Sequence, residues 1–295
     1  MSFWALNQRI PGRIWRLDMG QNADKIIVAI VLTVVGIILY LCLNVVIRRL
    51  VAMVRSQEEY DEDVDGKMTK AEKQAFEESK IVEQGKRGIG FKDVYAEYKG
   101  RFIVTAVLGG VLGGLVGYTF GASFDAAILF IFFAVLTVIA FVDMDTMEIP
   151  PVLNLIILVL GIISLIGSFV SDSGQMLFEI TWQQRLIGFF SVSVFMLVVT
   201  VLVAGAFGGG DIKLMAAAGL LLGWRGTLIA FLIGLIVGAV IGIILMSRKK
   251  KGGKEHMPFG PSLCIGLVMA TLVGNQLIDW YMNIIRNAMP NTFGK

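Results

Sequence analysis

The chain has 295 residues, of which 56% are hydrophobic and only 17% are charged, and its net charge at pH 7 is +3. Ordinary soluble domains carry roughly 25% charged residues, and several apolar runs here approach or exceed the roughly 20 residues that cross a bilayer. The composition excludes an ordinary soluble enzyme. It predicts an all-α polytopic membrane protein with membrane lipids, and no nucleic acid, among its partners.

The N-terminal segment, residues 1–24, contains three arginines and two tryptophans ahead of the first long apolar run. Basic and aromatic residues of this kind are typical of a segment that lies in the membrane interface. A cleaved signal peptide would have a different order of charge and apolar residues. We therefore expect residues 1–24 to be interfacial and residues 25–47 to form the first span.

The segment 48–101 is rich in Glu and Lys and holds 12 Lys and Arg residues. Basic residues accumulate in cytoplasmic loops, so we predict that this segment is a polar cytoplasmic insert between the first two spans. The loop 247–256 holds five more basic residues and is expected on the same side. The remainder, residues 102–295, is predicted to be the catalytic membrane core.

Apolar runs predict about eight transmembrane segments. Seven are long, and one is short and lies directly after a glycine-rich stretch. The long ones are predicted at about 26–47, 102–121, 124–143, 151–170, 185–206, 226–246 and 259–282, and the short one at about 212–223.

Alternating these segments across the membrane brings two acidic residues to one side. The third span ends at Asp143 and the fifth ends just before Asp211, so both are expected near the cytoplasmic face. Ionisable residues at membrane depth are functional candidates. Two adjacent carboxyl groups share a proton, and such a pair activates water and protonates a leaving group in aspartic proteases.

The surrounding residues leave two questions open. Asp211 follows Gly208, Gly209 and Gly210, which we expect to let the backbone unwind or approach a peptide closely; alternatively, Asp211 simply caps the next helix. Asp143 competes with Asp145 for the first catalytic position. Asp143 lies about 3 Å deeper on a helix that rises 1.5 Å per residue, so we favour Asp143.

Four stretches resemble motifs of the prepilin peptidases, which are membrane aspartyl proteases. Their order matches the family across about 220 residues. The stretches are "LNVVIRRL" (43–50), "VDMDTMEIP" (142–150), "GGGDIKL" (208–214, the G-x-G-D signature) and "MPFGPSLCIG" (257–266).

The resemblance implies cleavage of the basic leader of type IV prepilins or pseudopilins at the cytoplasmic face of the bacterial inner membrane. It implies Asp143 and Asp211 as the catalytic pair. It also implies that a further set of residues shapes the site and contacts substrate. These are Gly208, Gly209, Gly210, Lys213, Pro150, Pro258, Gly260 and Pro261.

Many family members also N-methylate the cleaved product with S-adenosylmethionine, and bifunctional members carry two C-x-x-C pairs in the first loop. Here the segment 48–101 contains no cysteine, so we expect no zinc site and no cofactor for proteolysis. Asn44 and Arg48 remain from the N-terminal motif as a possible methyltransferase remnant. The sequence leaves methylation, and with it a need for S-adenosylmethionine, open.

Two alternative functions would use the same residues. A presenilin-type protease pairs G-x-G-D with Tyr-Asp and Pro-Ala-Leu motifs, but Val142 precedes Asp143 and no Pro-Ala-Leu occurs. A transporter or assembly component would use the two carboxylates for ions or protons, and such proteins often contain internal repeats. The chain shows no convincing repeat.

Overall fold

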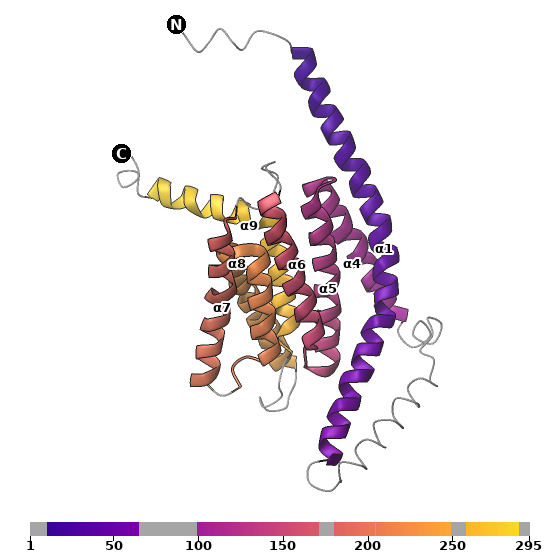
Figure 1. The fold of residues 1–295 in the computed structure, drawn as a ribbon, viewed down its shortest axis with the longest axis vertical. Helices are drawn as coiled ribbons and strands as arrows, with labels where there is room; N and C mark the ends of the chain where they lie inside the picture. The colour runs from indigo at the N-terminus through magenta and orange to yellow at the C-terminus, as the bar shows by residue number, and fades with distance from the viewer. Residues whose placement is uncertain (1–10, 65–98, 171–179, 204, 249–257, 289–295) are drawn as a thin grey trace.

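The computed structural model describes residues 11–64, 99–170, 180–203, 205–248 and 258–288 (Figure 1). All elements in these ranges are α-helices, which confirms the predicted fold class. They are α1 (Pro11–Val64), α4 (Lys99–Phe120), α5 (Phe124–Thr146), α6 (Pro151–Val170), α7 (Trp182–Leu202), α8 (Gly209–Arg248) and α9 (Gly260–Ala288).

Within the described residues, five helices are long and apolar enough to cross a membrane. These stretches are Ala23–Gln57, Lys99–Phe120, Phe124–Thr146, Trp182–Leu202 and Gly209–Ile244. Two further apolar helices, Pro151–Gly167 and Gly260–Gly274, are shorter. The membrane character is therefore confirmed, whereas the number of crossings remains a prediction.

The helix α1 is continuous from Pro11 to Val64. It joins most of the predicted interfacial segment, the first span and the beginning of the charged insert in one rod, and its C-terminal part extends past the end of the bundle (Figure 1). Most of the insert, residues 65–98, lies outside the described residues. The proposed division of the chain into segments remains a prediction.

Glycines allow α4 to pack closely against α1. A Cβ atom at Gly117 would lie 2.6 Å from the Cα atom of Ala29, and one at Gly109 would lie 2.6 Å from the Cγ atom of Tyr40. Small residues at four-residue intervals let helix backbones approach closely in membranes. This contact fixes α1 on the outer side of α4 (Figure 1).

The helix α8 is broken at Gly223, which has a φ of 68° and a ψ of 175°. A positive φ of this size favours glycine. The break falls at the end of the apolar segment that the sequence predicts at 212–223 and before the one predicted at 226–246. It divides α8 into a first half, residues 209–222, and a second half, residues 224–248.

Contacts with neighbouring helices show that the two halves run in opposite directions. The first half runs parallel to α6, because Gly210 lies against Ile149 and Gly161 against Leu220. The second half returns toward the start of α9, where Gly238 lies against Phe259. As a result, both ends of α8 lie at the same end of the bundle.

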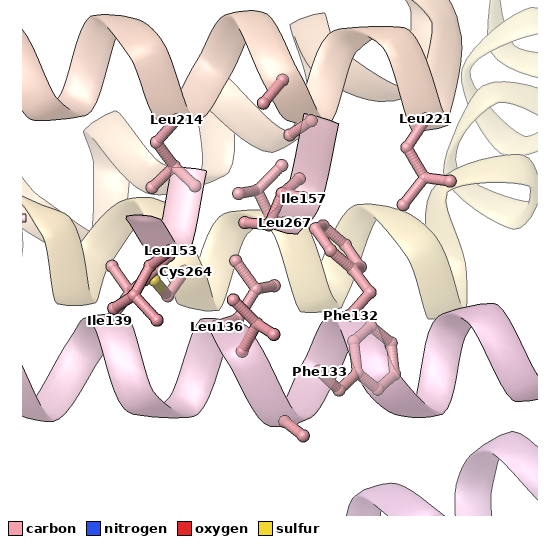
Figure 2. Packing of buried hydrophobic residues seen from close by; sticks show 14 of the residues in the cluster. Phe132, Phe133, Leu136, Ile139, Leu153, Ile157, Leu214, Leu221, Cys264 and Leu267 are labelled. Atoms are coloured by element: carbon pink, nitrogen blue, oxygen red, sulfur yellow. The ribbon is translucent and has the colours of Figure 1, made fainter. Parts of the chain in front are cut away.

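The helix α5 is the most buried of the candidate spans and forms the centre of the bundle. Its apolar side chains pack against α6 and α9, and the same apolar cluster continues to the first half of α8 (Figure 2). The labelled residues of this core are Phe132, Phe133, Leu136, Ile139, Leu153, Ile157, Leu214, Leu221, Cys264 and Leu267. The core therefore joins the helices that carry both candidate aspartates.

Candidate active site

The end of α5 and the beginnings of α6, α8 and α9 meet at one end of the bundle, the lower end in Figure 1. Asp143, in the last turn of α5, is 4% exposed, and Asp211, in the first turn of α8, is 7% exposed. Gly210, the neighbour of Asp211, lies against Ile149 in the connection that follows Asp143. The structure therefore brings together the two aspartates that the sequence singled out.

The way α5 ends fixes the place of Asp143. Met147 adopts a left-handed conformation with a φ of 56°, and its N–H donates to the Asp143 carbonyl oxygen at 2.8 Å. This closure is a common way for a helix to end. The buried Pro150 follows, and Pro151 begins α6, where a proline suits the first turn of a helix.

The beginning of α9 lies directly against Asp143. The N–H of Gly260 donates a hydrogen bond to Asp143 Oδ2 at 3.0 Å. A Cβ atom at Gly260 would lie 2.7 Å from the same oxygen. Free N–H groups at a helix start favour a negative charge. Gly260 thus has a specific contact at the site, while Pro258 and Pro261 on either side of it are half-buried.

The glycine-rich stretch differs from the expectation of an unwound backbone. Gly209 and Gly210 are already helical, in the first turn of α8, and only Gly208 is outside the helix. Close packing explains Gly210, because a Cβ atom there would lie 2.9 Å from Ile149 Cβ. The small residues therefore let the start of α8 approach the connection between α5 and α6.

Asp211 caps the start of α8 with one carboxyl oxygen, which accepts a hydrogen bond from the backbone N–H of Gly208, and its other oxygen is left for a further role. It is the third residue of α8, and its Oδ2 atom faces Gly208, where a Cβ atom would lie 3.2 Å away. Its Oδ1 atom is buried and has no hydrogen-bond partner within the described part of the chain. A buried acceptor without a donor is costly. This oxygen is therefore available to a water molecule or a substrate.

Asp145 lies in a different environment from Asp143. Its two carboxylate oxygens accept hydrogen bonds from Arg101 at 2.7 Å each, and its main-chain carbonyl accepts one from Arg55 at 3.3 Å. The Arg101–Asp145 ion pair is partly exposed and joins α4 to the end of α5. Because Arg101 binds both carboxylate oxygens of Asp145, Asp143 is the better candidate for the pair with Asp211.

Three other predicted site residues are not among the contacts of the pair. Lys213 is exposed, and a position two residues after Asp211 lies on a different helix face. Asn44 is buried and donates to Thr105 Oγ1 at 2.7 Å, between α1 and α4. Arg48 lies one turn further along α1 and is half-buried.

A residue outside the predicted site contacts the turn before Asp211. Asn154, in the first turn of α6, donates from Nδ2 to the carbonyl oxygen of Gly210 at 3.1 Å. The signal that marks it is a polar residue in an apolar run, four residues after Pro150.

Residues 130–243 match the type IV leader peptidase family. This range contains Asp143 and Asp211. This part of the chain is similar to the type IV leader peptidases. The recognition from short motifs is thus confirmed, and the G-x-G-D stretch lies within the matched prepilin peptidase region.

Relatives named prepilin leader peptidase/N-methyltransferase match parts of the chain. The one from Aeromonas hydrophila is 33% identical over 160 residues, 50% of this chain and 50% of that protein. The one from Bacillus subtilis is 30% identical over 104 residues, which are 35% of this chain and 42% of that protein. The one from Legionella pneumophila is 44% identical over 75 residues, which are 25% of this chain and 26% of that protein.

These matches thus span half or less of the length of the prepilin peptidase relatives. No solved structure matches the chain. In the described ranges, no group of three or more His, Cys, Asp or Glu side chains is arranged to hold a metal ion.

Proposed function

We propose that the chain is a membrane-embedded aspartyl endopeptidase that removes the basic leader peptide of type IV prepilins or pseudopilins. The observation that carries the proposal is the pair of buried carboxyl groups, Asp143 and Asp211, within the region that matches the leader peptidase family. Within the described residues, no basic side chain donates a hydrogen bond to either carboxyl group, as one would in a structural ion pair.

In the proposed mechanism, the pair holds one proton between its two carboxyl groups. The ionised carboxylate takes a proton from water, whose oxygen attacks the carbonyl carbon of the scissile bond. The protonated carboxyl group donates to the carbonyl oxygen of the peptide. Collapse of the tetrahedral intermediate breaks the C–N bond as the amide nitrogen receives a proton. No metal is needed.

The groups around Asp143 and Asp211 suit these roles of proton acceptor and proton donor. The Gly260 N–H orients one oxygen of Asp143, and the unpartnered Oδ1 of Asp211 is free to bind the attacking water. Pro258 and Pro261 flank Gly260, and Gly208, Gly209 and Gly210 provide a surface with no side chains beside Asp211. We propose that the extended leader junction lies along these glycines.

For the membrane arrangement, we propose eight crossings, counting the two halves of α8 separately. We assign the end of the bundle that carries Asp143 and Asp211 to the cytoplasmic side. The C-terminal part of α1, with Arg48, Arg49 and Arg55, lies at that end. Basic residues favour the cytoplasmic side of a membrane. The protein would then reside in the bacterial inner membrane and receive its substrates from the cytoplasm.

The names of the relatives add N-methyltransferase activity to peptidase activity. The aspartate pair accounts for cleavage alone. S-adenosylmethionine would be required for methylation of the mature N-terminus, and Asn44 and Arg48 are the residues of the N-terminal motif that remain for it. The absence of cysteines from residues 48–101 rules out zinc bound by that segment's cysteines.

The ion-transporter alternative receives less support. Substrate and ion sites of secondary transporters lie near the middle of the membrane. Here Asp143 lies in the last turn of α5 and Asp211 in the first turn of α8. Both carboxyl groups are therefore at helix ends, where an extended peptide from the cytoplasm can reach them.

The test is cleavage of a purified prepilin by the purified chain in detergent or liposomes. We expect wild type to release the leader, and Asp143→Asn and Asp211→Asn to lose activity by a factor of at least about 1,000, as for essential catalytic groups. Asp145→Asn is the matched control and should retain activity. If wild type does not cleave, or both aspartate variants cleave normally, the proposal fails. The mass of the mature product with S-adenosylmethionine present reports methylation.

A further inference from the structure

Asn154 makes the contact that connects α6 to the residue before Asp211. Its side chain is 5% exposed, and its Nδ2 atom donates to the carbonyl oxygen of Gly210 at 3.1 Å. The residue that follows Gly210 in the chain is Asp211. Buried polar side chains in membrane helices commonly bond across helices, but here the acceptor is the peptide group that carries a candidate catalytic residue.

The orientation of the amide follows from its partner. A carbonyl oxygen accepts hydrogen bonds, so the atom that faces Gly210 O has to be the amide nitrogen. The Asn154 Oδ1 atom then points elsewhere, and it is buried without a hydrogen-bond partner within the described residues. The Oδ1 atom of Asp211 is in the same situation. Two buried acceptors thus flank the Gly210 peptide.

Apolar packing holds the same peptide from another direction. Gly210 lies against Ile149, which precedes Pro150 in the connection between α5 and α6. Asp143 lies six residues before Ile149, and Asn154 lies five residues after it. The connection that follows one carboxyl group therefore contacts the helix start that carries the other, through Ile149 and Asn154.

We propose that Asn154 is a positioning residue for catalysis, which holds the Gly210 carbonyl so that the Asp211 carboxyl group faces Asp143. This inference rests on the proposed peptidase function. It assigns to Asn154 no direct role in bond cleavage. It makes the distance between the two carboxyl groups depend on a hydrogen bond from a third helix, α6.

Three substitutions separate the hydrogen bond from the shape of the side chain. Asn154→Leu removes both polar atoms, and Asn154→Asp keeps the shape but, once ionised, has no hydrogen to donate. Both are expected to lower kcat by on the order of tenfold to a hundredfold, the cost of a misplaced catalytic group, with KM for prepilin little changed. Asn154→Gln retains the amide donor and is expected to recover part of kcat.

A readout that is independent of cleavage follows the start of α8 directly. Gly209→Cys places a thiol where a Cβ atom has nothing within 4 Å, and Cys42→Ser removes the exposed native thiol while Cys264 remains buried. In this background, Asn154→Leu is expected to raise the rate of maleimide labelling several-fold, because the helix start opens more often. Ser164→Ala, which removes another buried polar group of α6, is the matched control and should leave labelling unchanged.

Lower kcat with faster labelling for Asn154→Leu and Asn154→Asp, but not for Ser164→Ala, supports the proposal. Unchanged kcat in both Asn154 variants overturns it, even if labelling changes, and so does an equal effect of Ser164→Ala. If wild type does not cleave prepilin, the peptidase function fails. Labelling of Gly209→Cys then still tests whether Asn154 holds the start of α8 in place. Unchanged labelling when Asn154→Leu is added would show that it does not.

Discussion

The main-chain N–H of Gly260 points at the carboxyl group of Asp143, with 3.0 Å between the nitrogen and Oδ2. One residue comes from the first turn of α9 and the other from the last turn of α5, 117 positions apart in the chain. The start of one helix thereby orients a carboxyl group at the end of another. The effect of disturbing this contact can be predicted.

Gly260→Ala should lower the rate of prepilin cleavage without unfolding the chain. The added methyl group would lie 2.7 Å from Asp143 Oδ2, so the carboxyl group has to move, and displacement of a catalytic group by about 1 Å costs on the order of a hundredfold in rate. Prepilin cleavage rates measure the effect. Gly274→Ala in the same helix is the matched control, because a Cβ atom there has nothing within 4 Å. Equal rates for the two variants would show that the contact does not matter.

Gly210→Ala should destabilise the start of α8 more than Gly209→Ala does. A Cβ atom at Gly210 meets Ile149 Cβ at 2.9 Å, whereas one at Gly209 has nothing within 4 Å. Overpacking of this kind typically costs about 1–3 kcal/mol. Thermal unfolding in detergent, followed by tryptophan fluorescence or circular dichroism, measures the difference. A Gly209→Ala variant at least as unstable as Gly210→Ala would contradict the packing argument.

Arg185→Met should lower the stability of the bundle. The buried guanidinium of Arg185 donates to the carbonyl oxygens of Leu220 and Leu221 at 3.2 and 3.0 Å, just before the break at Gly223. Without it, the last carbonyls of the first half of α8 lose their donors. The cost of such unsatisfied buried groups is about 1–3 kcal/mol each.

Thermal unfolding again provides the measurement. Gln183→Ala, at an exposed position in the same turn of α7, is the control and should unfold near the wild-type temperature. Arg185→Lys retains a donor and is expected to fall between wild type and Arg185→Met. If Arg185→Met unfolds with wild type, the hydrogen bonds to Leu220 and Leu221 contribute little stability.

The Arg101–Asp145 ion pair should have a small effect on both stability and cleavage. Its side chains are 19% and 22% exposed, and partly exposed ion pairs are generally worth about 1 kcal/mol or less. A double-mutant cycle with Arg101→Ala and Asp145→Asn measures the coupling through thermal unfolding and prepilin cleavage. Loss of cleavage in Asp145→Asn, with Asp143→Asn still active, would reverse the assignment of the catalytic aspartate.

Much of the helix pattern could be predicted from the sequence, because an apolar run of sufficient length indicates a membrane helix by itself. The predicted segment 151–170 coincides with α6, and 102–121 and 124–143 differ from α4 and α5 by a few residues at their ends. The separate segments at 212–223 and 226–246 correspond to the halves of α8. Asp143 and Asp211 were placed on one side by counting crossings.

The contacts around the pair could not be predicted, because they depend on which helix faces pack together. Gly260 was expected from its motif, but its bond to Asp143 requires the start of α9 to meet the end of α5. Lys213 lies in the G-x-G-D stretch and is exposed all the same, since helix geometry turns it away from Asp211. Asn154 gains its importance only from its distance to Gly210.

The break at Gly223 has a consequence for the lipid around the enzyme. The first half of α8, residues 209–222, rises only about 20 Å at 1.5 Å per residue, whereas the hydrocarbon layer of a bilayer is about 30 Å thick. A helix shorter than the layer produces hydrophobic mismatch, which the bilayer relieves by thinning locally. Thinning beside Asp211 would bring the aqueous phase down to the carboxyl pair, so that a hydrolytic reaction within a membrane could obtain its water from the adjacent solution.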